Sequence, residues 1–317
     1  MIDLTQEEIM KNWGVDNSNN PLVSIKCMTY NHENYIAQCI DGFLMQKTNF
    51  PFEILIHDDC STDKTESIVR DYEAKFPKII KGIYETENQW KKGCGAHHTK
   101  IDAAIKGKYI AICEGDDYWI DENKLQMQVD FLENNPEYGM CYTRAMLYNQ
   151  SEQKFSTRIY GSEVKSYEDL YINGNKIITL TTMYKKDLLY KYQNEVCPND
   201  KGWLMGDLPM WLYFSKSTKM KFMNEATGVY RCLEESASHT NDLKKKEAFR
   251  KSSENIRRYF AEKYGEKHLL HRYIVFEEFL INVEKKMFCK ALYCLIKQPK
   301  ILFSRRSFIL YVKELLR

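Results

Sequence analysis

The chain has 317 residues, 44% of them hydrophobic, which is enough to bury a sizeable core in one large domain or in one domain with an appendage. Its 46 Lys and Arg residues nearly balance 44 Asp and Glu residues, so the net charge of +2 gives no sign of a nucleic-acid partner bound through bulk charge. No apolar run approaches the ~20 residues of a membrane-spanning helix, and the acidic first residues do not match a signal peptide. We therefore expect a cytoplasmic protein that reaches the inner face of the membrane only if something recruits it.

The first 113 residues alternate between strand-like and helix-like periodicity. The spacing predicts strands over 21–30, 52–57, 79–85 and 108–113, with helices over 35–44, 63–76 and 99–107. The strands are apolar on both faces, which is typical of a parallel sheet covered by helices on each side. The predicted fold class is therefore α/β, with a mainly parallel central sheet flanked by helices.

Acidic and polar residues directly follow three of these strands, over 31–33, 58–63 and 114–117. Ligands of open α/β sheets bind beyond the carboxyl ends of the strands, so the three clusters are expected to converge on one rim. Carboxylates gathered at a cleft need a compensating cation, and oxygen ligands suit Mg²⁺ or Mn²⁺. The rim is thus expected to hold a metal-bound diphosphate. The alternative is that each cluster caps a helix or forms a solvated turn, and for Asp63 this is the better interpretation.

Three segments in this order resemble the nucleotide-binding half of family 2 glycosyltransferases, which are inverting enzymes of the GT-A fold: VSIKCMTYNHENYIAQCI, FEILIHDDCSTDKT and GKYIAICEGDDYW. The resemblance is close over residues 21–150 and looser to about residue 240. It implies an N-terminal extension over 1–20 and a GT-A domain over 21–240, with a nucleotide-binding half (21–120) and an acceptor half (121–240). A helical C-terminal region follows over 241–317.

The resemblance also implies a donor site made of residues that follow the strands or stand beside them: Thr29, Asn31, Glu33, Asp59, Asn88, His98, Glu114 and Asp116. Asp58 is expected to support its turn. The acidic motif of the family is often Asp-x-Asp-Asp, and here Glu114 takes its first position. Asp116 and Asp117 are the expected ligands of Mn²⁺ or Mg²⁺, although the longer Glu114 leaves open which acid touches the metal. His98 stands near the place of a pyrophosphate-binding arginine in many members, and a structural role is its alternative.

Catalysis requires a further carboxylate, because in an inverting transfer the acceptor hydroxyl loses its proton as it attacks. The segment GWLMGDLPMWLYF (202–214) resembles the family segment in which an acid at the start of a helix is the base, and that acid is Asp207. Its alternative role is an ordinary helix cap. Glu234 and Glu235 are the next candidates. They follow the pair Tyr230 and Arg231, which matches the end of another family segment.

The expected function is metal-dependent inverting transfer from a nucleotide-sugar, with a UDP-sugar as the expected donor, to a surface polysaccharide or a lipid-linked glycan. One alternative is a sugar-phosphate nucleotidyltransferase, which usually has a glycine-rich loop after the first strand, and NHENY provides none. The other alternative is a non-catalytic nucleotide-sugar-binding module.

The C-terminal region combines apolar and basic residues, above all in KALYCLIKQPKILFSRRSFILYVKELLR (290–317). An interfacial helix on anionic lipid has this composition, and so does a helix that packs on the catalytic domain with a basic outer face. Both interpretations are open at this point. The ten cysteines are scattered without a CxxC pair, which favours reduced, mostly buried thiols over a disulfide framework.

Overall fold

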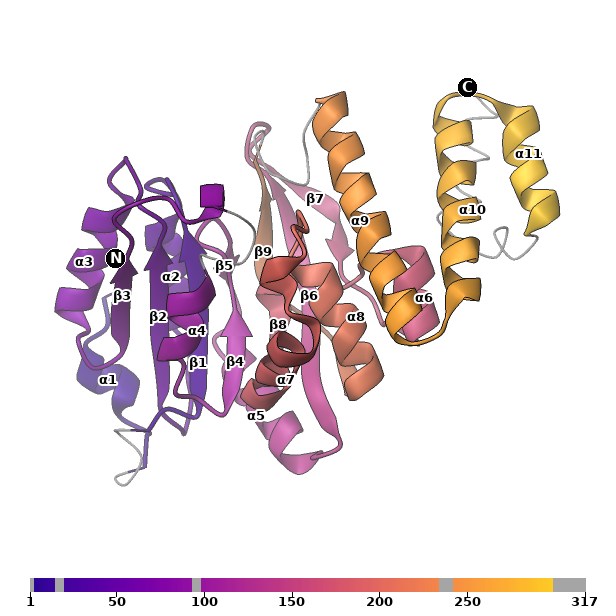
Figure 1. Cartoon of the computed structure of the whole chain (residues 1–317). Helices are drawn as coiled ribbons and strands as arrows, with labels where there is room; N and C mark the ends of the chain where they lie inside the picture. The colour runs from indigo at the N-terminus through magenta and orange to yellow at the C-terminus, as the bar shows by residue number, and fades with distance from the viewer. Residues whose placement is uncertain (1–2, 15–19, 93–97, 234–241, 299–317) are drawn as a thin grey trace.

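The computed structural model describes residues 3–14, 20–92, 98–233 and 242–298 (Figure 1). A nine-stranded sheet has the order β3-β2-β1-β4-β8-β6-β9-β5, and β7 pairs with β6 beside this path. The strands are β1 (Val23–Thr29), β2 (Phe52–Asp58), β3 (Ile80–Tyr84), β4 (Tyr109–Ile112), β5 (Tyr118–Trp119), β6 (Tyr138–Asn149), β7 (Lys154–Tyr160), β8 (Thr182–Lys185) and β9 (Lys219–Cys232).

Helices cover both faces of this sheet. They are α1 (Gln6–Met10), α2 (Ile36–Leu44), α3 (Thr65–Lys75), α4 (Thr99–Ala104), α5 (Lys124–Asn134), α6 (Tyr167–Asn173), α7 (Lys186–Val196), α8 (Asp207–Ser217), α9 (Leu243–Lys263), α10 (Lys267–Glu284) and α11 (Phe288–Lys297), with short 3-10 turns at Trp90–Lys92, Thr179–Thr181 and Pro198–Asp200. One hydrophobic core joins the sheet to α1, α2, α3 and α5. The other joins its opposite face to α4, α6, α7 and α8.

The expected strands and helices of the first half are all present, and their order is confirmed. β1 pairs in parallel with β2 and with β4, and β2 pairs in parallel with β3. The carboxyl ends of β1, β2 and β4 therefore lie at one edge, as the rim requires. Beyond β4 the sheet is mixed, because β8 is antiparallel to both β4 and β6, and β5 is antiparallel to β9. The sheet is therefore parallel in its first half, as expected, and mixed in the remainder.

The helix boundaries follow local chemistry. The face of α2 predicted from spacing is buried, including Ile36, Ile40 and Phe43. α3 begins at Thr65 instead of Asp63, and the Asp63 carboxylate accepts the N–H of Thr65 at 2.9 Å. Asp63 therefore accepts a hydrogen bond from the first residue of the helix although it lies before that residue in the chain, which agrees with the capping interpretation.

The C-terminal helices α9, α10 and α11 share the hydrophobic core that lies under α6, α7 and α8. Ile256 and Phe260 of α9 are fully buried, and the ring of Phe260 lies 6.4 Å from that of Trp203. Figure 1 shows α9 beside the second half of the sheet and α10 and α11 farther out. In the described ranges, none of the helices has the length and apolarity to cross a bilayer. Over 242–298 the expected helical region is present, and its first helix packs on the domain that holds the sheet. The remainder of the expected apolar and basic stretch, 299–317, lies outside the described residues.

Candidate active site

The loops that follow β1 and β2 are tied together at the rim. Asn31 has a left-handed backbone (φ 54°), and its side-chain oxygen accepts the N–H of Thr62 at 2.8 Å. Glu33 accepts the N–H of Lys64 at 3.0 Å. In the structure, these two predicted donor residues therefore bind the neighbouring loop and fix its shape. Thr29, at the end of β1, is buried, and its hydroxyl lies 3.1 Å from His32 Nδ1.

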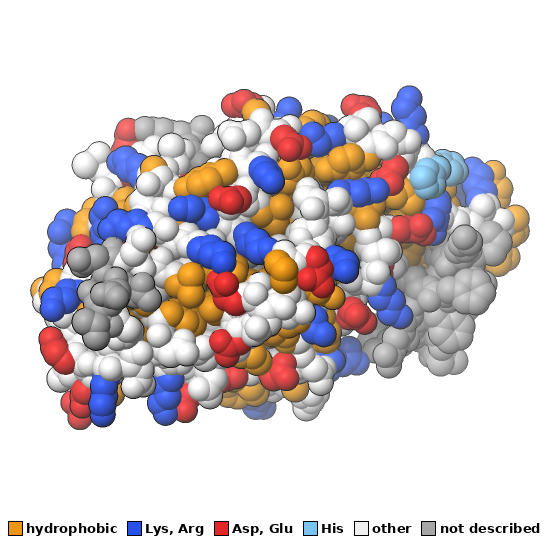
Figure 2. All heavy atoms as spheres, turned by 90° about the horizontal axis from the view of Figure 1, so that it is seen from below, with side chains coloured by type: hydrophobic (Ala, Val, Ile, Leu, Met, Phe, Trp, Pro, Cys, Tyr) orange, Lys and Arg blue, Asp and Glu red, His pale blue; other side chains and the backbone are white. Residues whose placement is uncertain are grey.

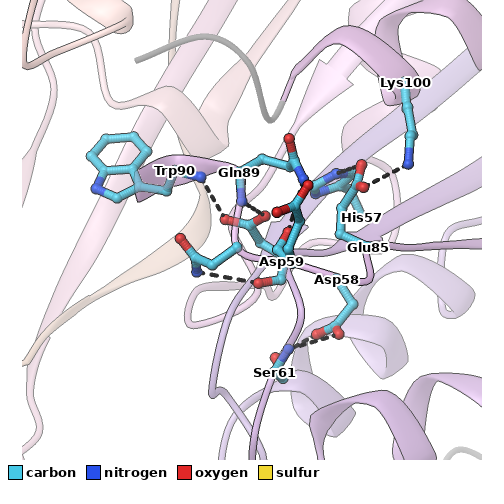
Figure 3. Close-up of polar contacts among 10 residues, drawn as sticks. His57, Asp58, Asp59, Ser61, Glu85, Gln89, Trp90 and Lys100 are labelled. Atoms are coloured by element: carbon cyan, nitrogen blue, oxygen red, sulfur yellow. Dashed lines mark hydrogen bonds and ion pairs between the residues drawn. The ribbon is translucent and has the colours of Figure 1, made fainter. Parts of the chain in front are cut away.

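The acid pair after β2 splits into two roles (Figure 3). Asp58 accepts the N–H of Ser61 at 3.1 Å, so it supports its own turn as expected. Asp59 accepts the backbone N–H groups of Gln89 and Trp90 at 2.7 and 3.0 Å, one on each carboxylate oxygen. The side chain of Asn88 donates to the backbone oxygen of Asp59 at 3.2 Å. Asp59 thus anchors the 88–90 segment.

A buried polar group behind Asp59 was not predicted from the sequence. His57 Nε2 lies 3.1 Å from Glu85, and Lys100 Nζ donates to the other Glu85 oxygen at 2.6 Å (Figure 3). Burial alone would raise the pKa of Glu85, but the hydrogen bonds from Lys100 and His57 hold this pKa below its usual value. The group connects β2 to the start of α4. No local motif marks it, because its members are far apart in the chain.

The acidic loop 114–117 is held close to β1. The N–H of Gly115 donates to Met28 O at 2.9 Å, and a Cβ added at Gly115 would lie 2.7 Å from Thr29 Oγ1. A glycine is therefore needed here for close approach. Glu114 and Asp116 are half-buried. Their carboxylates are the ones available to a ligand at this loop.

Asp117 and Arg231 form the support of the acidic loop. Asp117 is 2% exposed and accepts the backbone N–H of Arg231 at 2.7 Å, while the Arg231 guanidinium donates to the backbone oxygen of Asp116 at 2.6 Å. This guanidinium also packs over the ring of Tyr118, 4.6 Å from its centroid. The geometry therefore favours Asp116 over Asp117 as the acid that contacts a metal. Metal ligation by Asp117 stays a prediction.

Asp207 is the first residue of α8, and the structure gives its carboxylate two partners. One oxygen accepts the N–H of Leu208 at 2.7 Å, and the other accepts the side-chain amide of Asn175 at 2.6 Å. Asn175 was not predicted from the sequence, because no motif surrounds it. Burial raises the pKa of Asp207 above its usual value. An acid with a raised pKa is a better proton acceptor than an ordinary surface carboxylate.

Asp207 acts electrostatically on the acidic loop. Burial, together with the negative charges of Asp116 and Asp207, raises the pKa of Glu114 to about 7. Asp207 is therefore close enough to act on the loop electrostatically. His98 belongs to the same region, since its Nε2 lies 4.0 Å from the position of a Cβ on Gly206. Glu114, His98 and Asp207 therefore lie in one region of the domain.

The site fits a divalent cation that also takes ligands from a bound diphosphate. Within the part of the chain that the structure describes, no group of three or more His, Cys, Asp or Glu side chains is arranged as a complete metal site. Mg²⁺ usually takes only one or two carboxylates from the protein and the rest from substrate phosphates and water. The half-buried Glu114 and Asp116 match that donor set. Burial is the main cause of the raised pKa of Glu114, and the neighbouring negative charges of Asp116 and Asp207 add to it.

Comparison with known proteins identifies the family. A profile described as Glycosyl transferase family 2 matches residues 24–193, which is more than half of the chain. The chain belongs to glycosyl transferase family 2. The putative teichuronic acid biosynthesis glycosyltransferase TuaG of Bacillus subtilis is 30% identical over 230 residues, 72% of this chain and 84% of that protein. An uncharacterised protein of Mycobacterium tuberculosis is 42% identical over 120 residues, so the match spans 38% of this chain and 34% of the relative.

Solved structures of glycosyltransferases share the fold. S. aureus TarS 1–349, in complex with UDP-GlcNAc, superposes with a TM-score of 0.60 at 17% identity, covering 92% of this chain and 88% of the 1–349 chain. The mannosyltransferase PcManGT of Pyrobaculum calidifontis, in complex with GDP-Man and Mn²⁺, gives a TM-score of 0.51 at 16% identity, covering 94% and 88%. The GT-A fold expected for this family 2 member is confirmed, and so is its membership of a glycosyltransferase family. Glu234 and Glu235, the other candidates for the base, lie outside the described residues.

Proposed function

We propose that the protein is a metal-dependent inverting glycosyltransferase that moves a sugar from a UDP-sugar to a hydroxyl of a surface polysaccharide or a lipid-linked glycan. The observation that carries this proposal is the proximity of Asp207 to the acidic loop, where its negative charge contributes to the raised pKa of Glu114. The names of relatives support the substrate classes. They include a teichuronic acid glycosyltransferase and WfgD of Escherichia coli, a UDP-Glc:alpha-D-GlcNAc-diphosphoundecaprenol beta-1,3-glucosyltransferase that is 36% identical over 115 residues, 36% of this chain and 42% of WfgD.

The proposed site divides into a donor side and an acceptor side. On the donor side Thr29, Asn31 and Asp59 shape the nucleoside pocket, since they fix the loops after β1 and β2. Glu114 and Asp116 face the ribose and the diphosphate. The cation held by Asp116 would supply positive charge to the departing diphosphate. Arg231 supports the acidic loop by donating a hydrogen bond to the backbone oxygen of Asp116.

On the acceptor side, Asp207 accepts the proton of the attacking hydroxyl. The hydrogen bond from Asn175 orients one carboxylate oxygen, and the N–H of Leu208 holds the other. Each oxygen retains a lone pair that can accept a further proton. We propose His98 as a donor to the diphosphate, because it lies beside the start of α8.

A lipid-linked acceptor would be located at a membrane. We propose that the protein works in the cytoplasm at the inner face of the membrane, where a lipid-linked acceptor would be reached. α11 exposes Leu292, Tyr293 and Ile296 on one side, which suits peripheral contact with lipid.

The test is incubation of the purified protein with a panel of UDP-sugars, a glycan acceptor and Mn²⁺, with free UDP measured in the product mixture. The proposal expects UDP release that depends on the cation and is abolished by EDTA. A nucleotidyltransferase would instead release pyrophosphate from a nucleoside triphosphate and a sugar phosphate. A binding module would retain affinity for UDP without any turnover, and either result would contradict the proposal.

A further inference from the structure

A pocket of about 520 Å³ lies at the opposite edge of the sheet from the donor site. Three lining residues stand just before parallel strands: Leu22 precedes β1, Pro51 precedes β2 and Lys108 precedes β4. Since these three strands are parallel, this edge is the amino-terminal one. Lys185 ends β8, which runs antiparallel to β4 and so reaches the same edge. Figure 2 views the molecule from below, on the side of this edge, and shows blue Lys and Arg side chains beside orange hydrophobic ones near the middle of the face. The pocket is therefore separate from the proposed active site.

One wall of the pocket is rich in positively charged side chains. It is formed by four lysines, Lys106, Lys108, Lys185 and Lys186. Among the described residues, only Lys108 has a carboxylate partner, Glu133 at 2.8 Å. Lys185 donates to the carbonyl of Pro136 at 2.6 Å and Lys186 to that of Lys106 at 3.4 Å, and both side chains are half-buried.

Besides Glu133, two further acids stand close to these four lysines and offset part of their charge. Asp187 is the acidic member of the lining. Glu53 accepts the backbone N–H of Lys106 and the hydroxyl of Ser24, at 2.8 and 2.6 Å, and these neutral donors leave its negative charge in place. A local surplus of cations therefore remains in a chain whose net charge is only +2.

The start of α7 adds to this surplus. Lys185 and Lys186 occupy its N-cap and first helical position, and no side chain caps the helix there. The N-terminal end of a helix carries partial positive charge and favours anions, so Asp187 in the first turn stabilises this end while the two lysines oppose it. Residues that break such a local rule are often found at functional sites.

The remaining wall is apolar, formed by Pro21, Leu22, Phe50 and Pro51. We infer that the pocket binds a phosphate group, either of a soluble phosphate or of an anionic lipid whose apolar part rests on this wall. Lysine ammonium groups bind phosphate as point charges, and several around one pocket attract it from a distance. The lysines would not stabilise the binding of an acceptor or product sugar that carries no phosphate.

The experiment uses the full-length protein without divalent cations and two probes. Inorganic phosphate is titrated calorimetrically, and co-sedimentation is measured with vesicles of phosphatidylglycerol and phosphatidylcholine against phosphatidylcholine alone. The test variant is Lys106→Glu with Lys186→Glu. The control is Lys154→Glu with Lys165→Glu, an equal change of charge at exposed residues outside the pocket. Melting temperatures of both variants show whether the fold is kept.

The inference predicts that the test variant binds the effective probe about tenfold more weakly than wild type, while the control variant is unchanged. Saturable binding of inorganic phosphate assigns the pocket to soluble phosphates. Binding only to phosphatidylglycerol vesicles assigns it to lipid. If wild type binds neither probe, or if both variants bind as wild type does, the inference is wrong. UDP release should be unaffected by the test variant, so this result is independent of the proposed function.

Discussion

At the scale of single residues, Asp59 is the clearest case in which the structure adds to what the sequence predicts. Its carboxylate anchors the 88–90 segment through two backbone N–H groups. In Asp59→Asn, the side-chain NH₂ would face one of those two backbone N–H groups, which would then lose its hydrogen-bond acceptor. Asp59→Asn should therefore lower the free energy of unfolding by about 1–3 kcal/mol, the cost of an unsatisfied buried group.

The same substitution should weaken UDP binding, because the loop it releases shapes the nucleoside pocket. Calorimetric titration with UDP and thermal unfolding would be measured on the same samples. Asn88→Ala is the comparison, since it removes only the side-chain bond to the Asp59 backbone and should have a smaller effect on both. Weaker UDP binding by Asp59→Asn at unchanged stability would show that Asp59 contacts the base directly and that its loop contacts are secondary.

Glu114 makes stability depend on pH. Its pKa is raised to about 7 in the folded protein, above the 4.5 of an exposed glutamate, so the folded state holds the proton more tightly. The stabilisation from this proton is complete below about pH 4.5 and is lost as pH rises through 7. In EDTA, Glu114→Gln should thus melt at a higher temperature than wild type at pH 8, and the difference should vanish at pH 4.

Adding Mn²⁺ and measuring a control variant test whether the pH dependence arises at Glu114. Mn²⁺ should raise the melting temperature of wild type at pH 8 and much less at pH 5, where protonation competes with the cation. Glu122→Gln serves as the control, because Glu122 is an exposed partner of Lys47. An equal effect of Glu114→Gln at every pH would contradict the assignment of the raised pKa.

At the scale of elements, the spacing between the acidic loop and β1 decides the geometry of the donor site. Ala at Gly115 would place a Cβ 2.7 Å from Thr29 Oγ1 and 2.8 Å from Thr29 Cβ, so the loop has to move. We expect Gly115→Ala to lose about 1–3 kcal/mol of stability, as in other overpacked sites. It should also weaken UDP binding in the presence of Mn²⁺.

Gly139→Ala is a matched control for that experiment. Its Cβ would lie 2.7 Å from Thr218 Oγ1, a similar clash at the start of β6 and away from the acidic loop. Gly139→Ala should lose stability and bind UDP as wild type does. Equal loss of UDP affinity in both variants would mean that stability alone explains the effect of Gly115→Ala.

The elements of the first half could be predicted from the sequence because their periodicity is strong and their turns are polar. Ile36, Ile40 and Phe43 mark one buried face of α2, and the acids after β2 and β4 mark the rim. The contacts that complete the site could not be predicted, because Asn175, Arg231 and the His57–Glu85 pair are brought in by tertiary structure. The exact start of α3 was also missed, by two residues at Asp63.

At the scale of the whole molecule, the mixed half of the sheet and the C-terminal helices form one unit. The antiparallel pairing of β8 was not visible in the sequence, since a short apolar strand reads alike in either direction. Arg257 of α9 joins the helical region to α6: its guanidinium donates to Tyr171 O at 2.6 Å, and the Tyr171 hydroxyl donates to Arg257 O at 2.6 Å.

Arg257→Leu should therefore destabilise the whole protein, by about 1–3 kcal/mol for each buried partner left unsatisfied. Arg258→Leu is the neighbouring control, because Arg258 is exposed and pairs only with Glu254 one turn earlier among the described contacts. Chemical denaturation followed by tryptophan fluorescence measures both. Two separate transitions in wild type, with only one shifted by Arg257→Leu, would show that the helical region unfolds independently.

The central claim of the account is that Asp207 accepts the proton of the acceptor hydroxyl. Asp207→Asn keeps the size of the side chain and removes its basicity, so it should affect the transition state and hardly affect donor binding. The measurement is turnover of the UDP-sugar with acceptor, alongside the affinity for UDP and Mn²⁺, in wild type and Asp207→Asn. The account predicts that kcat falls by about 10²–10⁴-fold while both affinities stay near those of wild type. Near-normal turnover by Asp207→Asn would contradict it.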